Sequence, residues 1–483
     1  MRAIVVAAVA VVLCAPGVAA QVPDRSGPPE LGPPPALVLP AIQRAELSNG
    51  ARVIMLEKHN VPLVQVNLVV GTGYAFDPPE LIGLAGMATD MMDEGAGGRD
   101  ALQLAEEIEF LGARLGIRAG GHQTTVSLHT PLSRLGPALE LMAAVALEPR
   151  FPAEELERKR LERLNQMLQA RDEPRAIASV MFDRTLYPDH PYGHPAIGYP
   201  ETVRAMTVED LRRWHETYFR PNNAFFVVVG DVTMEEIRPK LEALFGDWRR
   251  GRIPSIDWPE AEQVTSRRVY LVDKPGAPQS EIRVGRIGVP RLTDDYYALV
   301  VMNTILGGSF TSRLNQNLRE EHGFTYGAGS YFDFAQLAGP FQASSAVQTA
   351  VTDAALTEFM KELNGILEPV PEEELERAKN FVALRFPSRF QTVAGIAGQL
   401  TELELFDLPE GYFNEYVERI LGITQADVQR AARKYIVPDQ MAIIVVGDRA
   451  TIEESIRALD LGPIENLTIE DVLGPAPEIG GTQ

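Results

Sequence analysis

The sequence has almost no cysteine, since Cys14 is the only one among its 483 residues. The first 20 residues predict an export signal, because Arg2 precedes an apolar run at 3–13 and small residues at 18–20 precede a cut before Gln21. A mature chain that starts at Gln21 has no cysteine, which excludes disulfides, thiolate catalysis and cysteine-bound zinc. A retained anchor and a lipidated Cys14 are the alternatives, although Leu13 stands where a small residue would precede a lipidated cysteine.

Long apolar segments and positive charge are also scarce. After residue 20, no stretch approaches the ~20 apolar residues of a membrane-spanning helix, so we expect an exported, periplasmic protein without stable membrane insertion. The chain has 45 Lys and Arg against 66 Asp and Glu, which gives a net charge of −21. This charge repels phosphate groups and argues against nucleic acid and anionic lipid as partners.

The pattern of apolar residues predicts a mixed chain of the α+β class. Residues 21–40 are rich in proline and predict an extended lead-in. Strands are expected at 64–68, 113–118 and 123–130, and helical spacing recurs at about 80–94, 100–112, 132–147, 153–171 and 174–187. Because the helices come in groups, an α+β arrangement is favoured over a doubly wound sheet. The length exceeds the ~250–300 residues of a single core and indicates at least two domains.

An internal repeat indicates two related domains of about 200 residues. Thr207 to Asp210 opens a predicted helix that leads to Tyr218, Pro221 and an apolar strand ending at Gly230-Asp231. The same residue types recur 217 positions later, from Thr424 to Gly447-Asp448, and Glu155-Leu-Glu-Arg158 is echoed by Glu374-Leu-Glu-Arg377. We therefore predict an N-terminal domain at 41–248, a linker at 249–266, a C-terminal domain at 267–463 and a tail at 464–483.

The residues offer no metal site that can be recognised from their spacing. Zinc hydrolysis needs three protein ligands, an open position for water and a base, for example a His-x-x-Glu-His helix with a distant carboxylate. His190 and His194 are four apart, but Pro191 and Gly193 separate them, and His122 and His129 are expected on opposite faces of one strand. The other histidines are His59, His215 and His322. A displaced metal site is therefore the least favoured interpretation.

One segment resembles the zinc helix of the pitrilysin/insulinase family of zinc metallopeptidases. Gly83-Leu-Ala-Gly86-Met-Ala-Thr89-Asp90-Met91 is similar to that family's Gly-Leu-Ala-His-x-x-Glu-His-Met, and residues 157–166 resemble the helix of its third ligand. The resemblance puts Gly86 and Asp90 at the two zinc histidines, Thr89 at the catalytic glutamate and Gln166 at the third ligand. All four functional residues differ, so we expect this chain to bind no metal and to lack hydrolytic activity alone.

A second signature of the same family lies in the C-terminal half. Ile305-Leu-Gly-Gly308 to Tyr326 resembles the family segment in which an arginine and a tyrosine seven apart bind substrate and stabilise the tetrahedral intermediate, and Arg319 and Tyr326 match it. Without the resemblance, the residues favour the alternative that Arg319 pairs with a nearby glutamate such as Glu320 or Glu321, and that Tyr326 is a core strand residue. His190-Pro-Tyr-Gly193 and Phe219-Arg-Pro-Asn222 agree with the family as well.

The resemblance implies a complementary subunit. In bacterial members of similar length, two homologous subunits close like a clamshell, each with two domains of mostly antiparallel sheet and helices. One carries zinc, and the other supplies the arginine–tyrosine pair. This chain resembles the second kind, with zinc expected on the partner and peptide as substrate, added as a strand near Leu115–Ala119. The alternative is a stand-alone pseudopeptidase that binds peptides or acts as a scaffold.

Overall fold

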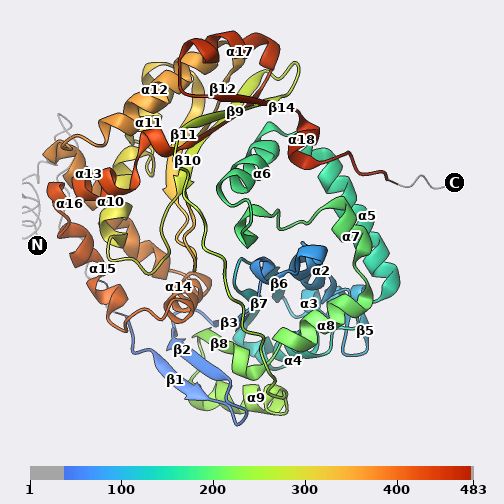
Figure 1. The fold of residues 1–483 in the computed structure, drawn as a ribbon. Helices are drawn as coiled ribbons and strands as arrows, with labels where there is room; N and C mark the ends of the chain where they lie inside the picture. Colours follow the sequence, from blue (N-terminus) through green and yellow to red (C-terminus); the bar gives the residue numbers. More distant parts are fainter. Residues whose placement is uncertain (1–36, 38, 480–483) are drawn as a thin grey trace, which may run out of the picture. The chain divides into compact units, whose positions relative to one another are not determined.

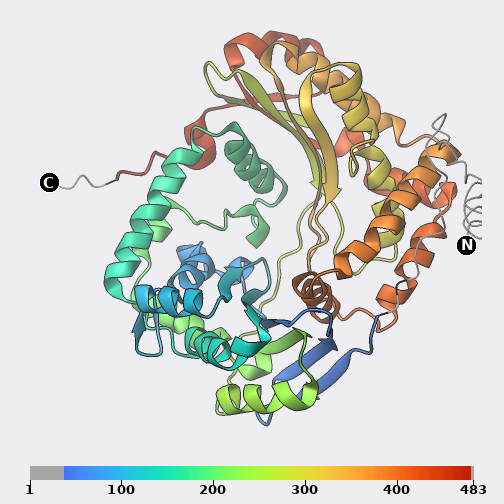
Figure 2. The ribbon, with the colours of Figure 1, turned by 180° about the vertical axis from the view of Figure 1, so that it is seen from behind.

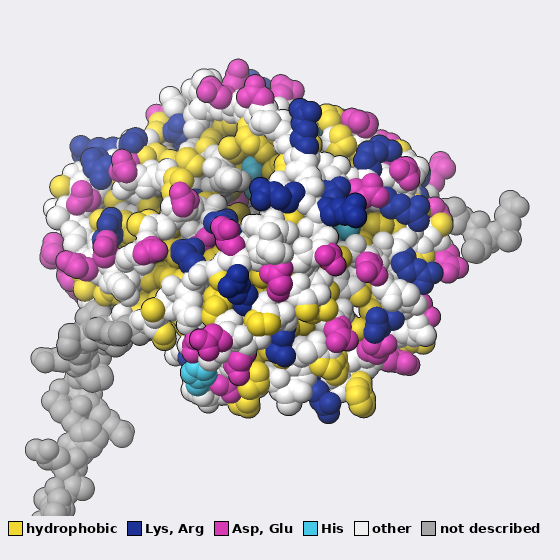
Figure 3. All heavy atoms as spheres, turned by 90° about the horizontal axis from the view of Figure 1, so that it is seen from below, with side chains coloured by type: hydrophobic (Ala, Val, Ile, Leu, Met, Phe, Trp, Pro, Cys, Tyr) yellow, Lys and Arg dark blue, Asp and Glu magenta, His cyan; other side chains and the backbone are white. Residues whose placement is uncertain are grey.

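The computed structural model describes residue 37 and residues 39–479. The predicted export signal and nearly all of the proline-rich segment lie outside the described residues. Among those that are described, no helix is long and apolar enough to cross a membrane. The face in Figure 3 carries acidic and basic side chains side by side, so the excess of negative charge is not gathered there into one patch.

The first half of the chain forms a six-stranded sheet in the order β1-β2-β8-β3-β7-β6. Only the pair β2–β8 is parallel. Its strands are β1 (Gln43–Glu46), β2 (Arg52–Glu57), β3 (Leu63–Val70), β6 (Arg114–Ala119), β7 (Thr124–Pro131) and β8 (Ala224–Gly230). A separate pair is formed by β4 (Gly95–Ala96) and β5 (Arg99–Asp100). Its helices are α2 (Leu84–Met91), α3 (Ala101–Phe110), α4 (Leu135–Leu147), α5 (Ala153–Ala170), α6 (Pro174–Leu186), α7 (Pro200–Ala205), α8 (Val208–Tyr218) and α9 (Met234–Phe245).

The second half repeats this topology, in the order β14-β9-β13-β10-β12-β11 (Figure 1). Five strands correspond in order and direction, and β14 replaces β1 at the edge but runs parallel to its neighbour. The strands are β9 (Arg268–Asp273), β10 (Gln279–Ile287), β11 (Thr325–Phe332), β12 (Pro340–Gln348), β13 (Ala442–Gly447) and β14 (Ile464–Leu467). The helices are α10 (Tyr296–Leu306), α11 (Arg313–Asn315), α12 (Thr352–Gly365), α13 (Glu372–Arg385), α14 (Val393–Leu405), α15 (Tyr412–Leu421), α16 (Gln425–Tyr435), α17 (Arg449–Ala458) and α18 (Ile469–Leu473). The predicted α+β class, with two related halves of mostly antiparallel sheet, is confirmed.

Equivalent local interactions produce the repeated segment. Thr207 begins α8 and Thr424 begins α16, and each forms a reciprocal capping box with the aspartate three residues later. After each helix, a short turn begins at a proline and leads into a fully buried strand, β8 or β13. The exact domain boundaries stay a prediction. Residues 464–467, which the sequence assigns to a tail, form β14 in the second sheet.

The two halves exchange one helix each. The apolar face of α6, with Ile177 and Phe182, packs on β10 and β13 of the second sheet. In return, α14 packs on β3 and β8 of the first sheet (Figures 1 and 2). The central strands, β3 and β8 of the first sheet and β10 and β13 of the second, are therefore covered on both faces. This explains why β3 is buried along almost its whole length, although the sequence predicts a half-buried, alternating strand there.

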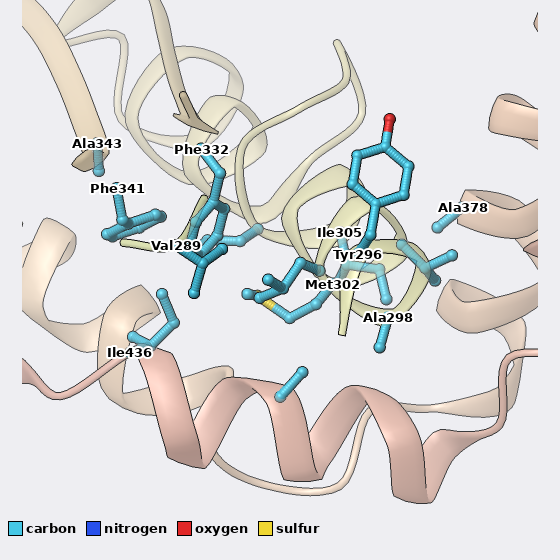
Figure 4. Close-up of a cluster of buried hydrophobic side chains, with 14 of the residues drawn as sticks. Val289, Tyr296, Ala298, Met302, Ile305, Phe332, Phe341, Ala343, Ala378 and Ile436 are labelled. Carbon is cyan, nitrogen blue, oxygen red and sulfur yellow. The ribbon is translucent and has the colours of Figure 1, made fainter. Parts of the chain in front are cut away.

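The second half contains the larger core, which joins its helices to the back of the first sheet. Figure 4 shows its centre, where Phe332 and Phe341 from paired strands lie close to Met302 of α10 and Ile436 beyond α16. The rings of Phe332 and Phe341 are 4.9 Å apart between centroids. Because this core crosses between the halves, the positions of the two sheets are coupled by close packing.

Candidate functional site

The four positions that correspond to the zinc ligands and base lie on α2 and α5. Gly86, Thr89 and Asp90 lie on α2, and Gln166 lies on α5, which packs against α2. Thr89 is buried, and its hydroxyl donates back to the carbonyl oxygen of Gly86 at 2.9 Å. Asp90 is half-exposed and Gln166 is exposed. Thr89 therefore bonds within its own helix and is not directed toward a shared site.

The guanidinium group of Arg163 fills the space beside Gly86. Arg163 is only 6% exposed, and its Nη2 donates to Oδ2 of Asp90 at 2.7 Å. Its Nη1 donates to the carbonyl oxygens of Gly83 and Ile197, at 3.1 and 3.3 Å. A Cβ atom on residue 86 would lie 3.0 Å from Nη2 of Arg163, so any side chain there requires the guanidinium to move by a few tenths of an ångström. The residues present do not fit a zinc ion, because a hydrogen-bonded cation lies beside two of the ligand positions, Gly86 and Asp90.

A buried carboxylate completes this arrangement at the start of α2. Asp77 accepts hydrogen bonds from the backbone N–H groups of Gly83 and Ala85, at 2.8 and 2.9 Å. Burial raises the pKa of Asp77 to about 7, although these two hydrogen bonds and the charge of Arg163 act to lower that pKa. Arg163 therefore interacts with two acids, because it donates to half-exposed Asp90 and its charge acts on buried Asp77. The sequence analysis gave neither Arg163 nor Asp77 a role, because Arg163 is not one of the functional positions of the segment 157–166 and Asp77 lies outside the family segments.

The described histidines bond to other side chains and to backbone groups, and they do not come together as the ligands of a metal site would. Within the described ranges, no group of three or more His, Cys, Asp or Glu could hold a metal ion. His190 accepts from the N–H of Tyr192 at 3.0 Å, and His194 lies 3.0 Å from the hydroxyl of Tyr199. The expectation that His122 lies on a strand is wrong. It lies in the turn before β7, because Gly120 and Gln123 already close the hairpin.

Arg319 and Tyr326 flank the free edge of the second sheet. Arg319 lies in a π-helical turn, Gln316–Glu321, where its guanidinium is 4.7 Å from the ring centroid of Phe310 and its Nε is 3.4 Å from Glu320. The pairing with Glu320 that the sequence allows is thus present, but it is partly exposed and weak. Tyr326 is 91% exposed at the start of β11, so it is not a core residue. Neither side chain is committed to the protein interior.

The two sheets differ at their free edges. On β11, the outward amides of Ala328 and Ser330 donate to Asn315 and to the carbonyl oxygen of Gly307, at 3.2 and 3.1 Å. The β6 edge is different. In an antiparallel pair of strands, hydrogen-bonded and non-hydrogen-bonded residue pairs alternate. Counted from the bonded pair Gly120–Gln123, residues 115, 117 and 119 are in non-bonded pairs, so their backbone groups point away from β7. In the described part of the chain, these three residues make no backbone hydrogen bond outside the β6–β7 pair. The first sheet can therefore accept another strand.

A cavity of about 560 Å³ lies where the two halves meet. The turn between β11 and β12 contacts the first half here through two hydrogen bonds. The hydroxyl of Tyr187 donates to the carbonyl oxygen of Ala338 at 2.8 Å, and the backbone N–H of Leu337 donates to the hydroxyl of Tyr192. The first half contributes Tyr74, Gly121, His122, Gln123, Asp183, Tyr187, Tyr192, His194, Pro195 and Ala196. The second half contributes Tyr331, Asp333, Phe334, Ala335, Gln336, Pro340, Gly398, Thr401, Glu402, Leu405 and Phe406.

Desolvation governs the charges in this cavity. Burial raises the pKa of Asp183 to about 7, while Arg283 opposes the shift and the charge of Asp333 adds to it. Asp333 lines the cavity and stays exposed to solvent, and the protein atoms around it raise its pKa only through partial desolvation. Burial and the nearby His190 lower the pKa of His122 to about 4, so this imidazole is neutral at pH 7.

Two related α+β halves, with a degenerate metal helix on the first and an arginine–tyrosine segment on the second, define the class of duplicated zinc-peptidase folds. A sequence model described as "Insulinase (Peptidase family M16)" matches residues 52–199, and one described as "Peptidase M16 inactive domain" matches residues 205–382. Together they cover about two thirds of the chain. The chain belongs to the insulinase family of peptidases, family M16.

Known relatives agree with this assignment over most of this chain. An uncharacterized zinc protease of Mycobacterium tuberculosis (strain H37Rv) is 25% identical over 88% of this chain and 98% of its own. The solved M16 inactive domain from Pseudomonas fluorescens is 26% identical, with a TM-score of 0.79 over 84% of this chain and 98% of that one. The periplasmic protease PqqL from Escherichia coli is similar in fold, with 16% identity and a TM-score of 0.72 over 88% of this chain and 50% of that one.

Proposed function

We propose that this chain is the non-catalytic, substrate-binding subunit of an exported zinc metallopeptidase complex. The observation that carries the proposal is the guanidinium of Arg163 beside Gly86, at the place where the family's first zinc ligand would stand. A homologous partner with an intact His-x-x-Glu-His helix provides the zinc and the base. This chain contributes part of the chamber wall, together with Arg319 and Tyr326.

The exposure of the arginine–tyrosine pair supports a role in a complex. Tyr326 is 91% exposed, and Arg319 has only a weak pairing with Glu320 to give up. A guanidinium and a phenol can both donate hydrogen bonds to the oxyanion that develops when water attacks a peptide carbonyl. An isolated scaffold has no use for two such donors on its surface, so their exposure favours action on a substrate held by the partner.

The free edge of β6 supports peptide binding. A peptide in extended conformation can pair with the outward backbone groups of residues 115, 117 and 119, which gives affinity with little dependence on sequence. The side chains of Leu115 and Ile117 are partly buried against the core of the first half, so this strand is held firmly in place. A stand-alone pseudopeptidase that binds peptides through the same edge is the second candidate function.

Export rests on the sequence of residues 1–20, which lie outside the described residues. The arrangement of Arg2, the apolar run and the small residues before Gln21 is that of a cleaved signal. The absence of cysteine after that cut suits an oxidising compartment, where no free thiol is then exposed. A periplasmic site of action is therefore part of the proposal.

The decisive experiment measures bound zinc and peptidase activity for the purified mature chain, alone and co-expressed with its nearest zinc-motif homologue from the same genome. We expect the chain alone to be inert and free of stoichiometric zinc, and the co-expressed pair to cleave peptides. Stoichiometric zinc together with activity in the chain alone would overturn the proposal. A chain that binds peptides but never restores activity to a homologue would favour the stand-alone candidate.

A matched set of variants tests the role of Arg163 in the same preparation. The four family residues can be restored by Gly86→His, Thr89→Glu, Asp90→His and Gln166→Glu. With Arg163 retained, we expect this variant to bind no stoichiometric zinc, because the guanidinium occupies the site and repels the ion. The same variant with Arg163→Ala should gain zinc. Equal zinc content in both would show that Arg163 does not block the site.

A further inference from the structure

The cavity between the halves contains two carboxylates without a partner of opposite charge. Among the described residues, neither Asp183 nor Asp333 has a cation within ion-pair distance. Arg283, the cation that acts on Asp183, donates its hydrogen bonds to Gln342 and to the carbonyl oxygen of Arg175, at 3.0 and 3.2 Å. Asp183 is partly enclosed by protein and has no paired cation, so a ligand that brings a positive charge would stabilise its charged form, while Asp333 is exposed and open to the same ligand.

The walls of the cavity suit the rest of a basic side chain. Tyr187, Tyr331 and Phe406 line it together with the two acids. Aromatic rings pack against the methylene groups of lysine or arginine, and their faces attract an ammonium or guanidinium group. A volume of about 560 Å³ is large enough for one such side chain together with adjoining backbone.

His122 offers a hydrogen-bond position that the protein does not fill. This residue is 5% exposed, lines the cavity, and has its Nε2 2.7 Å from the hydroxyl of Tyr192. In the described part of the chain, its buried Nδ1 has no hydrogen-bond partner. Buried polar atoms are nearly always paired, so this nitrogen beside the cavity lacks a hydrogen-bond partner, although the atom itself lies behind the surface of the wall.

The cavity lies at the end of the free strand edge. Gly121, His122 and Gln123 line it and form the turn that directly follows β6. A peptide paired with residues 115–119 therefore runs toward the cavity as it passes the last residue of β6. The backbone N–H groups of Tyr74 and Ala75 already donate to the carbonyl oxygens of Gly120 and Gly121. Backbone pairing of the peptide therefore ends at residue 119, and a side chain at that end is inferred to extend into the cavity.

We propose that this cavity binds the lysine or arginine side chain of a peptide that lies along β6, with Asp183 and Asp333 as the acceptors of its charge. The inference rests on the proposed peptide-binding function and gives it a substrate class, namely peptides with a basic residue. Asp183 comes from α6 and Asp333 from the β11–β12 turn, so both halves must be in place for the cavity to bind this side chain.

The test measures peptide binding by the full mature chain with fluorescence anisotropy. The probes are two fluorescein-labelled, C-amidated nonapeptides of alternating serine and valine, one with a central lysine and one with a central norleucine. We expect the lysine peptide to bind about tenfold more tightly, which is ~1.4 kcal/mol. In the double variant Asp183→Asn, Asp333→Asn, this preference should disappear. Asp247→Asn, which changes an exposed acid outside the cavity, is the matched control and should keep it.

The outcomes separate this inference from the function on which it rests. Equal binding of both peptides to the wild-type chain would overturn the basic-residue cavity and leave peptide binding by the chain intact. Binding of neither peptide would overturn both the cavity and peptide binding by the isolated chain. A lysine preference that survives in the double variant would show that other groups accept the charge. The comparison of peptides on the wild-type chain does not depend on how the variants fold.

Discussion

Replacing Arg163 by methionine is the sharpest test of the interpretation of the degenerate site. The methionine keeps most of the apolar stem but removes three interactions, with Asp90, Gly83 and Ile197. The ion pair contributes little, because Asp90 is 49% exposed. The two carbonyl oxygens lose charged donors inside the protein, and one such loss costs about 1–3 kcal/mol. Since the carbonyl of Gly83 also accepts from Met87, we expect about 2–3 kcal/mol in total.

The assay is hydrogen–deuterium exchange of the peptide that contains α2, because the lost interactions hold the start of that helix. A local destabilisation of this size speeds exchange by about 30- to 150-fold when exchange follows the opening equilibrium. Asp90→Asn is the matched control. It removes only the half-exposed charge, and its cost should stay under about 1 kcal/mol. Unchanged exchange in Arg163→Met, or an effect equal to that of Asp90→Asn, would refute the claim that the guanidinium holds this site together.

Three further predictions follow from other parts of the chain. Arg319→Ala should lower kcat of the assembled enzyme by roughly 10²-fold, as loss of one oxyanion donor does. Arg377→Ala, which changes an exposed arginine, is the control and should leave kcat unchanged. Equal kcat values for the two variants would refute the role of Arg319 as an oxyanion donor. Although burial opposes the shift, hydrogen bonds from Tyr435 and two cations hold the pKa of Asp295 below its ordinary value. Asp295→Asn should therefore reduce the free energy of unfolding at neutral pH, measured with urea, and this loss should shrink as pH falls below about 4. A difference between variant and wild type that stays constant with pH would contradict this. Gly193→Ala should cost about 3 kcal/mol of stability and lower the thermal midpoint, because the new Cβ atom would lie 1.9 Å from the carbonyl oxygen of Tyr187. A thermal midpoint equal to that of the wild type would contradict the clash.

The repeat made the fold predictable from the sequence. Capping residues and a proline turn recur around β8 and β13 because both halves need the same local chemistry at the same place, and such signals are local in the chain. The exchange of α6 and α14 was not predictable. Periodicity shows that a helix has an apolar face, but it does not show which sheet that face will cover. The burial of β3 on both faces escaped the sequence analysis for the same reason.

The candidate site was only partly predictable. The family motif pointed to Gly86, Thr89 and Asp90, whose positions on one helix are local. Arg163 enters the site from another helix, and although it lies in the segment 157–166, it is not one of that segment's functional positions. The cavity is a stronger example. Its acids come from α6 and from the β11–β12 turn, which are 150 residues apart in the chain and meet only through the exchanged helix. No local spacing could indicate that they share one cavity.

Gly86 and Arg163 depend on each other, and this dependence bears on how the site lost its metal-binding residues. A side chain at residue 86 would press on the guanidinium, while removal of the guanidinium alone would take a charged donor away from the carbonyl oxygens of Gly83 and Ile197. Neither change is tolerated well without the other, so a single substitution cannot lead this chain back toward a zinc site. The glycine and the arginine together form a stable alternative packing in which an internal cation replaces the metal. A half built in this way keeps the fold of a peptidase domain, and under the proposed function the hydrolytic chemistry would come from the partner subunit.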